Sequence, residues 1–268
     1  MRVALIVATY GRRAELVRLL DSLVVQAYRD FDVIIIDQNQ GGLVNIIAPF
    51  ADRLRLIHKI ARPVGVSAAR NIGLGLLTNQ DIVAFPDDDC WYEPDTIQNM
   101  VSFFNSYADV GCVIGRGKGA HRGRVNRYSV FSQSPTWLFA LRANMVNAIG
   151  GFDETIGPGA GSLCLGGEDT DYLLRGMLKG MKVMREPNIR IHHPDLLMNK
   201  MASNKVYMYG VARMTLLWRY RYPFWFRLVN MVYPLVRGFL SPHQLKYWLN
   251  MFRGRLGGNP IVAVERSR

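Results

Sequence analysis

The sequence contains little cysteine. Its three cysteines, Cys90, Cys112 and Cys164, are far apart in a chain of 268 residues and form no Cys-x-x-Cys pair. This spacing argues against a disulfide framework and against a cysteine-ligated zinc site, and it fits a reducing compartment. Hydrophobic residues make up 49% and charged residues 20% of the chain. These shares exclude a disordered or collagen-like protein and predict a globular core.

Long apolar runs are also missing. The longest stretches without Asp, Glu, Lys or Arg are 14 residues long, at 38–51 and 128–141, and both contain proline and polar residues. A membrane-spanning helix needs about 20 apolar residues. The apolar run at Val3–Ala8 is too short for the core of a signal peptide, and Arg12 and Arg13 follow it. We therefore expect a cytoplasmic protein without a transmembrane span.

Acidic residues are almost absent from the C-terminal quarter. Residues 1–199 hold 21 Lys or Arg and 20 Asp or Glu, whereas residues 200–268 hold 12 Lys or Arg and one acid, Glu265. Cations and aromatics interleave at Trp218–Arg227. This pattern fits an anionic membrane surface, helices packed on the core with arginine stems over rings, or single-stranded nucleic acid. We rank the membrane surface first, packed helices second and nucleic acid last, so no nucleic-acid partner is expected.

Apolar β-rich runs alternate with helical periodicity over the first 114 residues. Strands are predicted at Val3–Thr9, Phe31–Ile36, Leu54–His58, Asp81–Phe85 and Val110–Ile114. Helices are predicted at 12–26, 66–77 and 94–106, the last with Pro94 at its first position. This alternation predicts the α/β class, with a Rossmann-like, mostly parallel sheet flanked by helices.

The remaining chain is less regular. The sequence predicts a basic loop at 115–128, a helix at 172–179, extended chain at 182–193 and helices from about 199 onward that break at Pro223, Pro234 and Pro242. The basic, aromatic segment therefore forms a helical C-terminal extension.

Polar clusters follow three of the predicted strands. They are Thr9-Tyr10-Gly11, Asp37-Gln38-Asn39 and Asp87-Asp88-Asp89. In sheets of this kind, ligands bind outside the carboxyl ends of the strands. We therefore expect these clusters to converge on one edge of the sheet.

Three groups of residues can carry chemistry. Adjacent acids at Asp87–Asp89 repel one another unless a cation such as Mg²⁺ or Mn²⁺ neutralises them, although a solvated acidic turn is the alternative. Glu168 and Asp169 follow two glycines at a predicted helix start, where they either face a ligand or act as first-turn acids. His192-His193 offers a nitrogen ligand for a metal such as Mn²⁺, or is structural.

The order of motifs resembles a family 2 glycosyltransferase with the GT-A fold. The resemblance rests on Val7–Arg12, Gly65-Val66-Ser67-Ala68-Ala69-Arg70-Asn71-Ile72-Gly73, Asp87-Asp88-Asp89, Gly150-Gly151-Phe152-Asp153-Glu154 and Gly167-Glu168-Asp169-Thr170-Asp171. It covers roughly residues 1–195. It implies a GT-A catalytic domain at 1–198, with a nucleotide-binding half at 1–114 and an acceptor-side half at 115–198, and leaves 199–268 as the basic extension.

The resemblance implies a role for each matching residue. The donor nucleotide-sugar is implied to contact Thr9, Tyr10, Arg12, Asp37, Arg70, Asp87 and Asp88. Asp89, with Asp87, is implied to bind Mn²⁺ or Mg²⁺, and His192 or His193 completes the metal shell. Asp169 is implied to be the general base, and Glu168 beside it orients the acceptor.

These roles imply an inverting transferase of surface-polysaccharide or glycolipid assembly, placed on the inner face of the cell membrane. Its acceptor would be a saccharide or a lipid-linked saccharide. Many family members carry two acids where this chain has Asp37-Gln38. Because Gln38 carries no charge, this departure leaves the choice of base open, with uridine diphosphate as the first expectation and thymidine or guanosine diphosphate as the alternatives. The alternative is a non-catalytic homologue that binds a nucleotide-sugar or a membrane. A nucleotidyltransferase fits less well, because Thr9–Arg13 is a poor phosphate loop.

Overall fold

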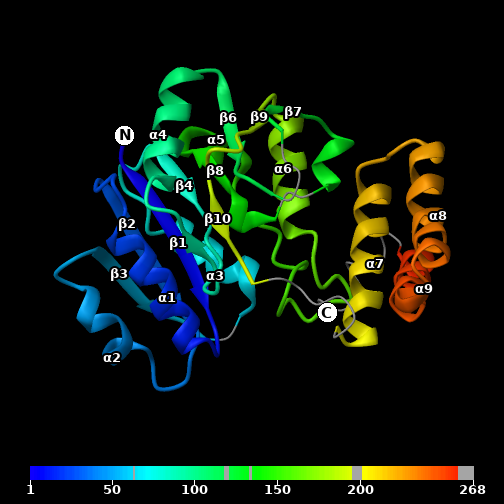
Figure 1. Cartoon of the computed structure of the whole chain (residues 1–268), viewed down its shortest axis with the longest axis horizontal. Coiled ribbons are helices and arrows are strands. Elements are labelled where there is room, and N and C mark those ends of the chain that lie inside the picture. Colours follow the sequence, from blue (N-terminus) through cyan, green and yellow to red (C-terminus); the bar gives the residue numbers. More distant parts are fainter. Residues whose placement is uncertain (63, 118–120, 133–134, 195–200, 259–268) are drawn as a thin grey trace. The chain divides into compact units, whose positions relative to one another are not determined.

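The computed structural model describes residues 1–62, 64–117, 121–132, 135–194 and 201–258. The chain divides into two compact units (Figure 1). The sheet unit comprises Met1–Val64, Ala68–Phe152 and Tyr172–Pro194, and the tail unit comprises Gly65–Ser67, Asp153–Asp171 and the described part of Asp195–Arg268. The catalytic domain expected at 1–198 and the extension expected at 199–268 remain predictions, and the two compact units divide the chain in another way.

The sheet unit is built on an eight-stranded sheet of order β3-β2-β1-β4-β8-β6-β9-β7, flanked by helices (Figure 1). The strands are β1 (Val3–Thr9), β2 (Phe31–Asp37), β3 (Arg55–Ile60), β4 (Ile82–Ala84), β6 (Val110–Ile114), β7 (Gly123–Val125), β8 (Phe139–Arg142) and β9 (Lys182–Arg185). Neighbours from β3 to β4 pair in parallel, as do β6 and β9. β8 runs antiparallel between β4 and β6, and β7 runs antiparallel beside β9. The predicted α/β fold with a mostly parallel sheet is confirmed.

Burial explains why the first strands were readable in the sequence. All seven residues of β2 are buried, as are six of the seven in β1. A strand covered on both faces is a continuous apolar run. The helices between strands are α1 (Arg13–Val24), α2 (Val44–Ile47), α3 (Val66–Leu74), α4 (Thr96–Ser106), α5 (Ala143–Ile149) and α6 (Glu168–Leu178). Short 3-10 turns lie at Ala48–Phe50, Ser129–Phe131 and Thr136–Leu138, and β5 (Trp91–Tyr92) pairs antiparallel with β10 (Ile191–His192).

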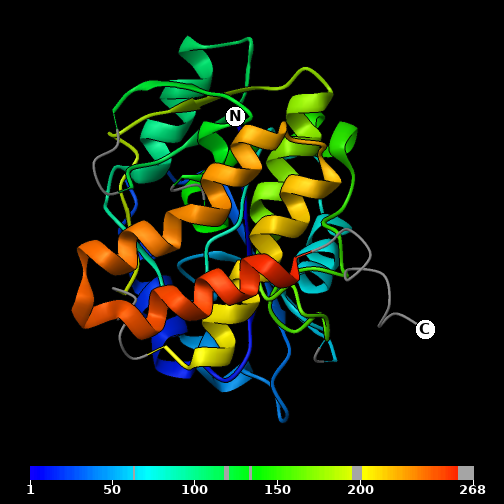
Figure 2. The same cartoon turned by 90° about the vertical axis from the view of Figure 1, so that its right-hand side faces the viewer.

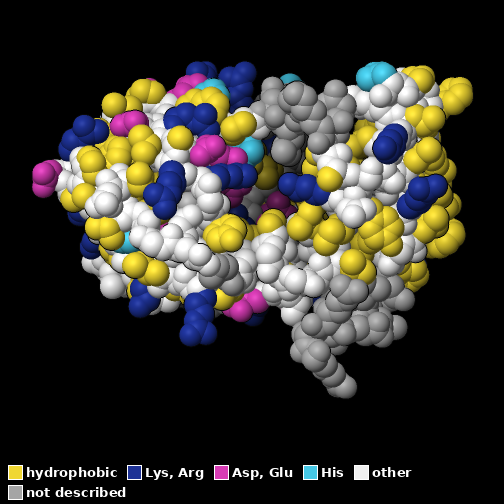
Figure 3. Space-filling view, turned by 90° about the horizontal axis from the view of Figure 1, so that it is seen from below, with side chains coloured by type: hydrophobic (Ala, Val, Ile, Leu, Met, Phe, Trp, Pro, Cys, Tyr) yellow, Lys and Arg dark blue, Asp and Glu magenta, His cyan; other side chains and the backbone are white. Residues whose placement is uncertain are grey.

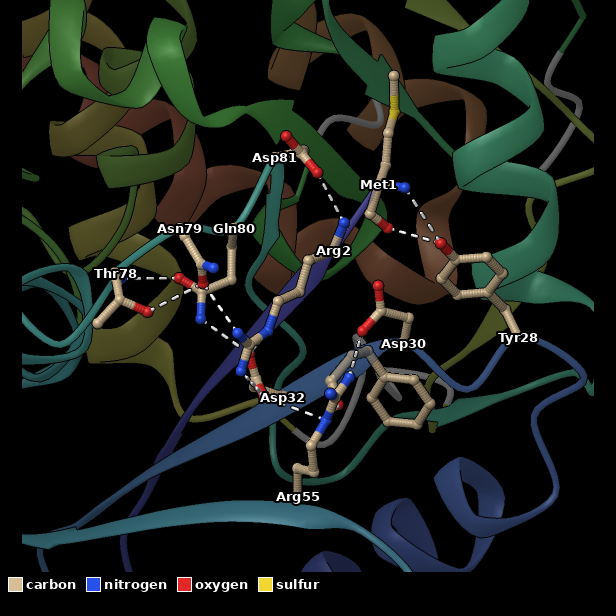
Figure 4. A network of polar contacts seen from close by, with 11 residues as sticks. Met1, Arg2, Tyr28, Asp30, Asp32, Arg55, Thr78, Asn79, Gln80 and Asp81 are labelled. Carbon is tan, nitrogen blue, oxygen red and sulfur yellow. Dashed lines mark hydrogen bonds and ion pairs between the residues drawn. The ribbon is translucent and has the colours of Figure 1, made fainter.

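A polar network closes the amino ends of β1 and β2 (Figure 4). Arg2 donates from Nε and Nη2 to the two carboxylate oxygens of Asp32, at 2.8 and 2.9 Å. Gln80 Nε2 donates to the same carboxylate at 2.8 Å, and Asp32 is 2% exposed. Burial acts to raise the pKa of Asp32, but the hydrogen bonds from Arg2 and Gln80 hold it below its usual value. No local pattern in the sequence indicates this network, because it joins residues up to 79 positions apart.

The tail unit contains α7 (Ser203–Arg219), α8 (Phe224–Leu240), a 3-10 turn at Pro242–Gln244 and α9 (Leu245–Gly257). In Figure 2, α7 is yellow, α8 orange and α9 red-orange. Gly210 of α7 and Gly254 of α9 meet at a helix crossing. A Cβ atom at either glycine would overlap the backbone of the other helix, so the crossing requires glycine at both positions.

The break predicted at Pro234 is wrong, because Pro234 lies buried inside α8. A proline in a helix has no N–H for the carbonyl four residues earlier, here that of Asn230. The Arg255 guanidinium of α9 donates to this carbonyl instead. Arg213 of α7 donates to the side-chain oxygen of Asn230 at 3.1 Å. Tertiary donors thus allow the helix to continue past proline. The breaks at Pro223 and Pro242 are confirmed. Pro223 lies between the end of α7 at Arg219 and the start of α8 at Phe224, and Pro242 follows the end of α8 at Leu240.

Other predicted boundaries shift by a few residues. The helix expected at 94–106 begins at Thr96, so Pro94 precedes its cap rather than filling its first position. The helix expected at 172–179 begins four residues earlier, at Glu168. β7 lies within the segment expected to be a basic loop. Among the described residues, no helix is both long enough and apolar enough to cross a bilayer.

Candidate functional site

The three consecutive aspartates lie at the carboxyl end of β4, where two arginines contact them. Arg70 of α3 donates to Asp87 at 3.0 Å. Arg12, at the end of β1, contacts Asp88 at 3.0 Å and Asp89 at 2.5 Å. The predicted convergence of strand ends therefore brings Arg12, Arg70 and all three aspartates together.

The environment of each aspartate differs. Burial raises the pKa of Asp87 above its usual value, against the opposing charge of Arg70. Burial also raises the pKa of Asp88, to about 6, although Arg12 and Thr9 oppose it. For Asp89, burial acts in the same direction, but its contacts with His193 and Arg12 hold its pKa below the usual value. Asp89 is thus the member of the cluster held most firmly as an anion.

The structure separates the two adjacent histidines. His193 Nε2 lies 2.9 Å from Asp89 Oδ1 and 3.9 Å from Asp87 Oδ2. His192 Nε2 lies 2.9 Å from Glu93, and the His192 ring stacks on Trp91 at 5.4 Å. Successive side chains of extended chain point to opposite faces, so only one of the pair can reach the aspartates. His193 is brought to the cluster and His192 is not.

The donor set of this cluster fits a divalent cation. One ligand atom from each of Asp87, Asp89 and His193 lies within 4.8 Å of the others. His193 Nδ1 lies 2.8 Å from the carbonyl oxygen of Pro194. A carbonyl can only accept, so Nδ1 carries a proton and Nε2 is the ring atom that faces the two carboxylates. Burial acts to lower the pKa of His193, but the hydrogen bond with Asp89 holds it above its usual value, and a bound cation would take the place of the proton on Nε2. Two carboxylate oxygens and one imidazole suit Mn²⁺ and also allow Mg²⁺.

Asp37, at the end of β2, is fully buried and heavily hydrogen-bonded. It accepts from the backbone and side chain of Asn39 at 3.0 and 2.9 Å, and His58 of β3 lies 2.9 Å away. Burial acts to raise the pKa of Asp37, but these partners hold it below its usual value. Sequence reasoning missed His58, which a β3 register opposite β2 places there. Tyr10 is 63% exposed at the end of β1, and Thr9 beside it is buried.

Gln38 is buried, and its side-chain carbonyl is already engaged. Oε1 accepts from the Val64 backbone N–H at 2.9 Å. Because an N–H donor fixes which amide atom is oxygen, the Nε2 group of Gln38 is left to donate. The residue that replaces the family's second acid thus presents a donor as well as an acceptor.

Glu168 and Asp169 lie in the tail unit, in the first turn of α6. The amino end of a helix favours negative charge there. Glu168 is buried. Its Oε2, like Ser67 Oγ, would lie 3.1 Å from a Cβ at Gly157, so polar oxygens line this glycine. Burial lowers the pKa of Arg213 in α7 to about 9, and the charge of Arg255 acts in the same direction. The carboxylate of Asp169 opposes this shift.

Sequence reasoning missed the partners of the neighbouring acids. Arg219, at the end of α7, contacts Asp153 at 2.6 Å and the buried Asp171 at 3.2 Å. The Tyr220 hydroxyl donates to Asp171 at 2.6 Å. The two motif segments around Asp153 and Asp171 are therefore held by one arginine of the basic tail.

The family model described as glycosyl transferase family 2 matches residues 4–156, more than half of the chain. The chain belongs to glycosyl transferase family 2. The matched segment includes Asp37, Arg70 and Asp87–Asp89, whereas Glu168, Asp169 and His193 lie beyond it. Within this family, an uncharacterized glycosyltransferase of Haemophilus influenzae is 24% identical over 194 residues, which are 69% of this chain and 63% of the relative. The aligned segments span between 16% and 63% of the curated relatives' own lengths.

Solved structures confirm the GT-A fold expected for this family. The mannosyltransferase PcManGT from Pyrobaculum calidifontis, in complex with GDP-Man and Mn²⁺, superposes with a TM-score of 0.71 at 15% identity, over 95% of this chain and 86% of that one. S. aureus TarS 1–349 in complex with UDP superposes with a TM-score of 0.62 at 14% identity, over 96% and 92%.

Proposed function

We propose that this family 2 glycosyltransferase moves a sugar from a nucleotide-diphosphate sugar to a hydroxyl of a saccharide or lipid-linked saccharide, with inversion. The observation that carries the proposal is the cluster of Asp87, Asp89 and His193, whose ligand atoms face one another at the carboxyl end of β4. Structurally similar proteins are solved with UDP and with GDP-Man and Mn²⁺, which supports this class of donor.

In the proposed donor site, each side chain binds a different part of the nucleotide-sugar. Asp37, with Thr9 and Tyr10, holds the base, Arg70 supports this pocket, and Asp87 reaches the ribose or sugar. Arg12 already binds Asp88 and Asp89, and its exposed guanidinium can also bind phosphate oxygens. A Mn²⁺ or Mg²⁺ ion held by Asp87, Asp89 and His193 would offset the negative charge of the departing diphosphate.

The proposed chemical step is a single displacement. The acceptor oxygen forms a bond to the anomeric carbon as the bond to the diphosphate breaks, and the diphosphate leaves with the electron pair. Asp169 takes the acceptor's proton as general base. Glu168, buried beside Ser67 and Gly157, orients the acceptor.

Gln38 bears on the choice of base. With Oε1 engaged by Val64, its Nε2 can donate to a base carbonyl. Both uracil and thymine present such a carbonyl, and so does guanine. We keep UDP as the first donor, with thymidine and guanosine diphosphates as the alternatives.

The remaining partner is the membrane. We propose that the basic tail binds an anionic membrane surface, as suits a lipid-linked acceptor. The expected place on the inner face of the cell membrane remains a prediction.

Calorimetry across UDP-, dTDP- and GDP-sugars, with Mn²⁺, Mg²⁺ or EDTA, tests the donor and the metal together. We expect one nucleotide family to bind, and EDTA to weaken that binding. His193→Gln should weaken Mn²⁺-dependent binding, whereas the matched control His192→Gln should not. Asp169→Asn should abolish transfer and leave donor binding intact. A folded protein that binds none of these donors would point instead to a non-catalytic homologue.

A further inference from the structure

Helix α8 has an inverted amphipathic character. Every exposed position between Phe224 and Leu240 carries an apolar or aromatic side chain. The most exposed are Phe239 at 84%, Phe224 at 71% and Leu240 at 66%. A surface helix of a soluble protein normally turns charged and polar residues to water. The outward face of α8 therefore lacks the polar residues that water would favour.

The inward face of α8 lacks the large apolar side chains that a buried helix face normally carries. Its buried residues are Asn230, Pro234 and Gly238, which are polar or small. Asn230 is held by Arg213 of α7 and Arg255 of α9, so these bonds fix the rotation of α8 about its axis. Polar contacts thus hold α8 against α7 and α9, and its large apolar side chains are exposed to solvent.

Positive charge borders this apolar face. The exposed cations nearest in sequence are Arg221 before α8 and Lys246 and Arg253 in α9. No acidic residue occurs between positions 196 and 264. Figure 3 shows hydrophobic side chains gathered over α8 and α9, at the right of the view, with Lys and Arg among them.

We propose that α8 lies flat in the interface of an anionic bilayer, with its apolar face among the upper acyl chains and the neighbouring cations at the lipid phosphates. At 1.5 Å per residue, its 17 residues form a rod of about 25 Å in the membrane plane. Apolar area and anionic lipid then act together, as peripheral anchors require. This inference deepens the proposed membrane partner, and it is independent of sugar transfer.

Charge decides between a bilayer and a second copy of the chain. Two copies packed through this face would bring Arg221, Lys246 and Arg253 of each together, and residues 196–264 of neither copy supply an acid to neutralise them. Anionic lipid supplies the missing negative charge. An apolar face close in sequence to these cations, with no acid in residues 196–264, therefore fits an anionic membrane better than a second copy of the chain.

The test is co-sedimentation of the full chain with vesicles of phosphatidylcholine containing phosphatidylglycerol, and with pure phosphatidylcholine. Phe224→Gln and Phe239→Gln should each weaken binding to the anionic vesicles by about 10- to 100-fold, the worth of burying one Phe side chain. Leu178→Gln in the sheet unit, at a residue 73% exposed, is the matched control and should leave binding unchanged. The Arg221→Gln, Lys246→Gln, Arg253→Gln triple variant should lose binding by about 100-fold, at about 1 kcal/mol per cation.

Three results would overturn the proposal. The first is equal vesicle binding by wild type and by Phe239→Gln. The second is a loss of binding as large in Leu178→Gln. The third is a concentration-dependent dimer in sedimentation velocity that Phe239→Gln abolishes, which would assign the face to a second copy. Circular dichroism checks that each variant is folded. Calorimetric donor binding by Phe239→Gln separates this outcome from a failure of the proposed transferase function.

Discussion

The contact between Arg255 and the Asn230 carbonyl yields a prediction with a defined free energy. Pro234 removes the helix donor for this carbonyl, and the Arg255 guanidinium replaces it. Arg255→Met leaves a buried carbonyl without a donor, which costs about 1–3 kcal/mol. In the Pro234→Ala background, the new N–H of residue 234 bonds the carbonyl, and the same substitution then costs less. We expect the two substitutions to be coupled by about 1–2 kcal/mol.

The coupling free energy between Arg255→Met and Pro234→Ala tests the contact better than Arg255→Met alone, because the single substitution combines opposing effects on stability. Burial lowers the pKa of Arg255 to about 10. At about 1.4 kcal/mol per pKa unit, this corresponds to roughly 3 kcal/mol of disfavoured charge, which Arg255→Met relieves. Pro234→Ala alone should stabilise the protein by up to about 3 kcal/mol, since proline in a helix interior carries that cost. Both single effects cancel in a double-mutant cycle.

The assay is urea unfolding of the four proteins, followed by far-UV circular dichroism and by tryptophan fluorescence. Trp218, Trp225 and Trp248 all report from the tail unit. Arg253→Met, an exposed arginine of the same helix, is the control and should show no coupling to Pro234→Ala. If Arg255→Met costs the same free energy in both backgrounds, within about 0.5 kcal/mol, the reasoning is refuted.

Three further predictions follow from single contacts. The pKa of Asp32 is lower in the folded chain than the unfolded value of about 3.9. The ionised Asp32 therefore stabilises the fold above that pH, and this stabilisation is lost as the pH falls through the folded pKa. In melting temperatures measured across a pH series, Asp32→Asn should reduce the fall at acid pH. Trp137 stacks on His193 at 5.1 Å, so Trp137→Ala should weaken Mn²⁺ affinity by about 2- to 10-fold in calorimetry, with little change in melting temperature. Asp171→Asn leaves Arg219 with one of its two carboxylates and removes a charged hydrogen-bond partner, so it should destabilise the chain by about 1–3 kcal/mol in urea, and an unchanged unfolding midpoint would contradict the contact between Arg219 and Asp171.

The sequence was most informative where one local pattern decides the structure. β1 and β2 are buried on both faces, so their apolar runs were unambiguous. The acids at the end of β4 were found for the same reason, because they interrupt such a run. Glu168 and Asp169 were placed at a helix start by the two glycines before them, and α6 begins there.

The sequence was silent where partners are distant along the chain. β8 has four residues and pairs antiparallel between strands more than 20 positions away, which no local periodicity records. His58 reaches Asp37 through the β3 register. Whether His192 or His193 contacts the aspartates depends on which face of the chain each side chain takes at the end of the two-residue strand β10. The break predicted at Pro234 is wrong because the rule that proline ends a helix considers one helix alone. It does not include a donor from another helix, here the Arg255 guanidinium of α9.

The tail unit joins two features that the sequence presented as separate. The acids proposed to act on the acceptor, Glu168 and Asp169, open a helix whose Asp171 is bound by Arg219 of α7. α7 in turn meets α9 at the Gly210–Gly254 crossing and α8 through Arg213 and Asn230. The outward face of α8 is therefore linked to the proposed base through contacts within one compact unit. If α8 lies in a bilayer, the same contacts fix the height of Asp169 above the lipid, and a lipid-linked acceptor would have to present its hydroxyl at that height.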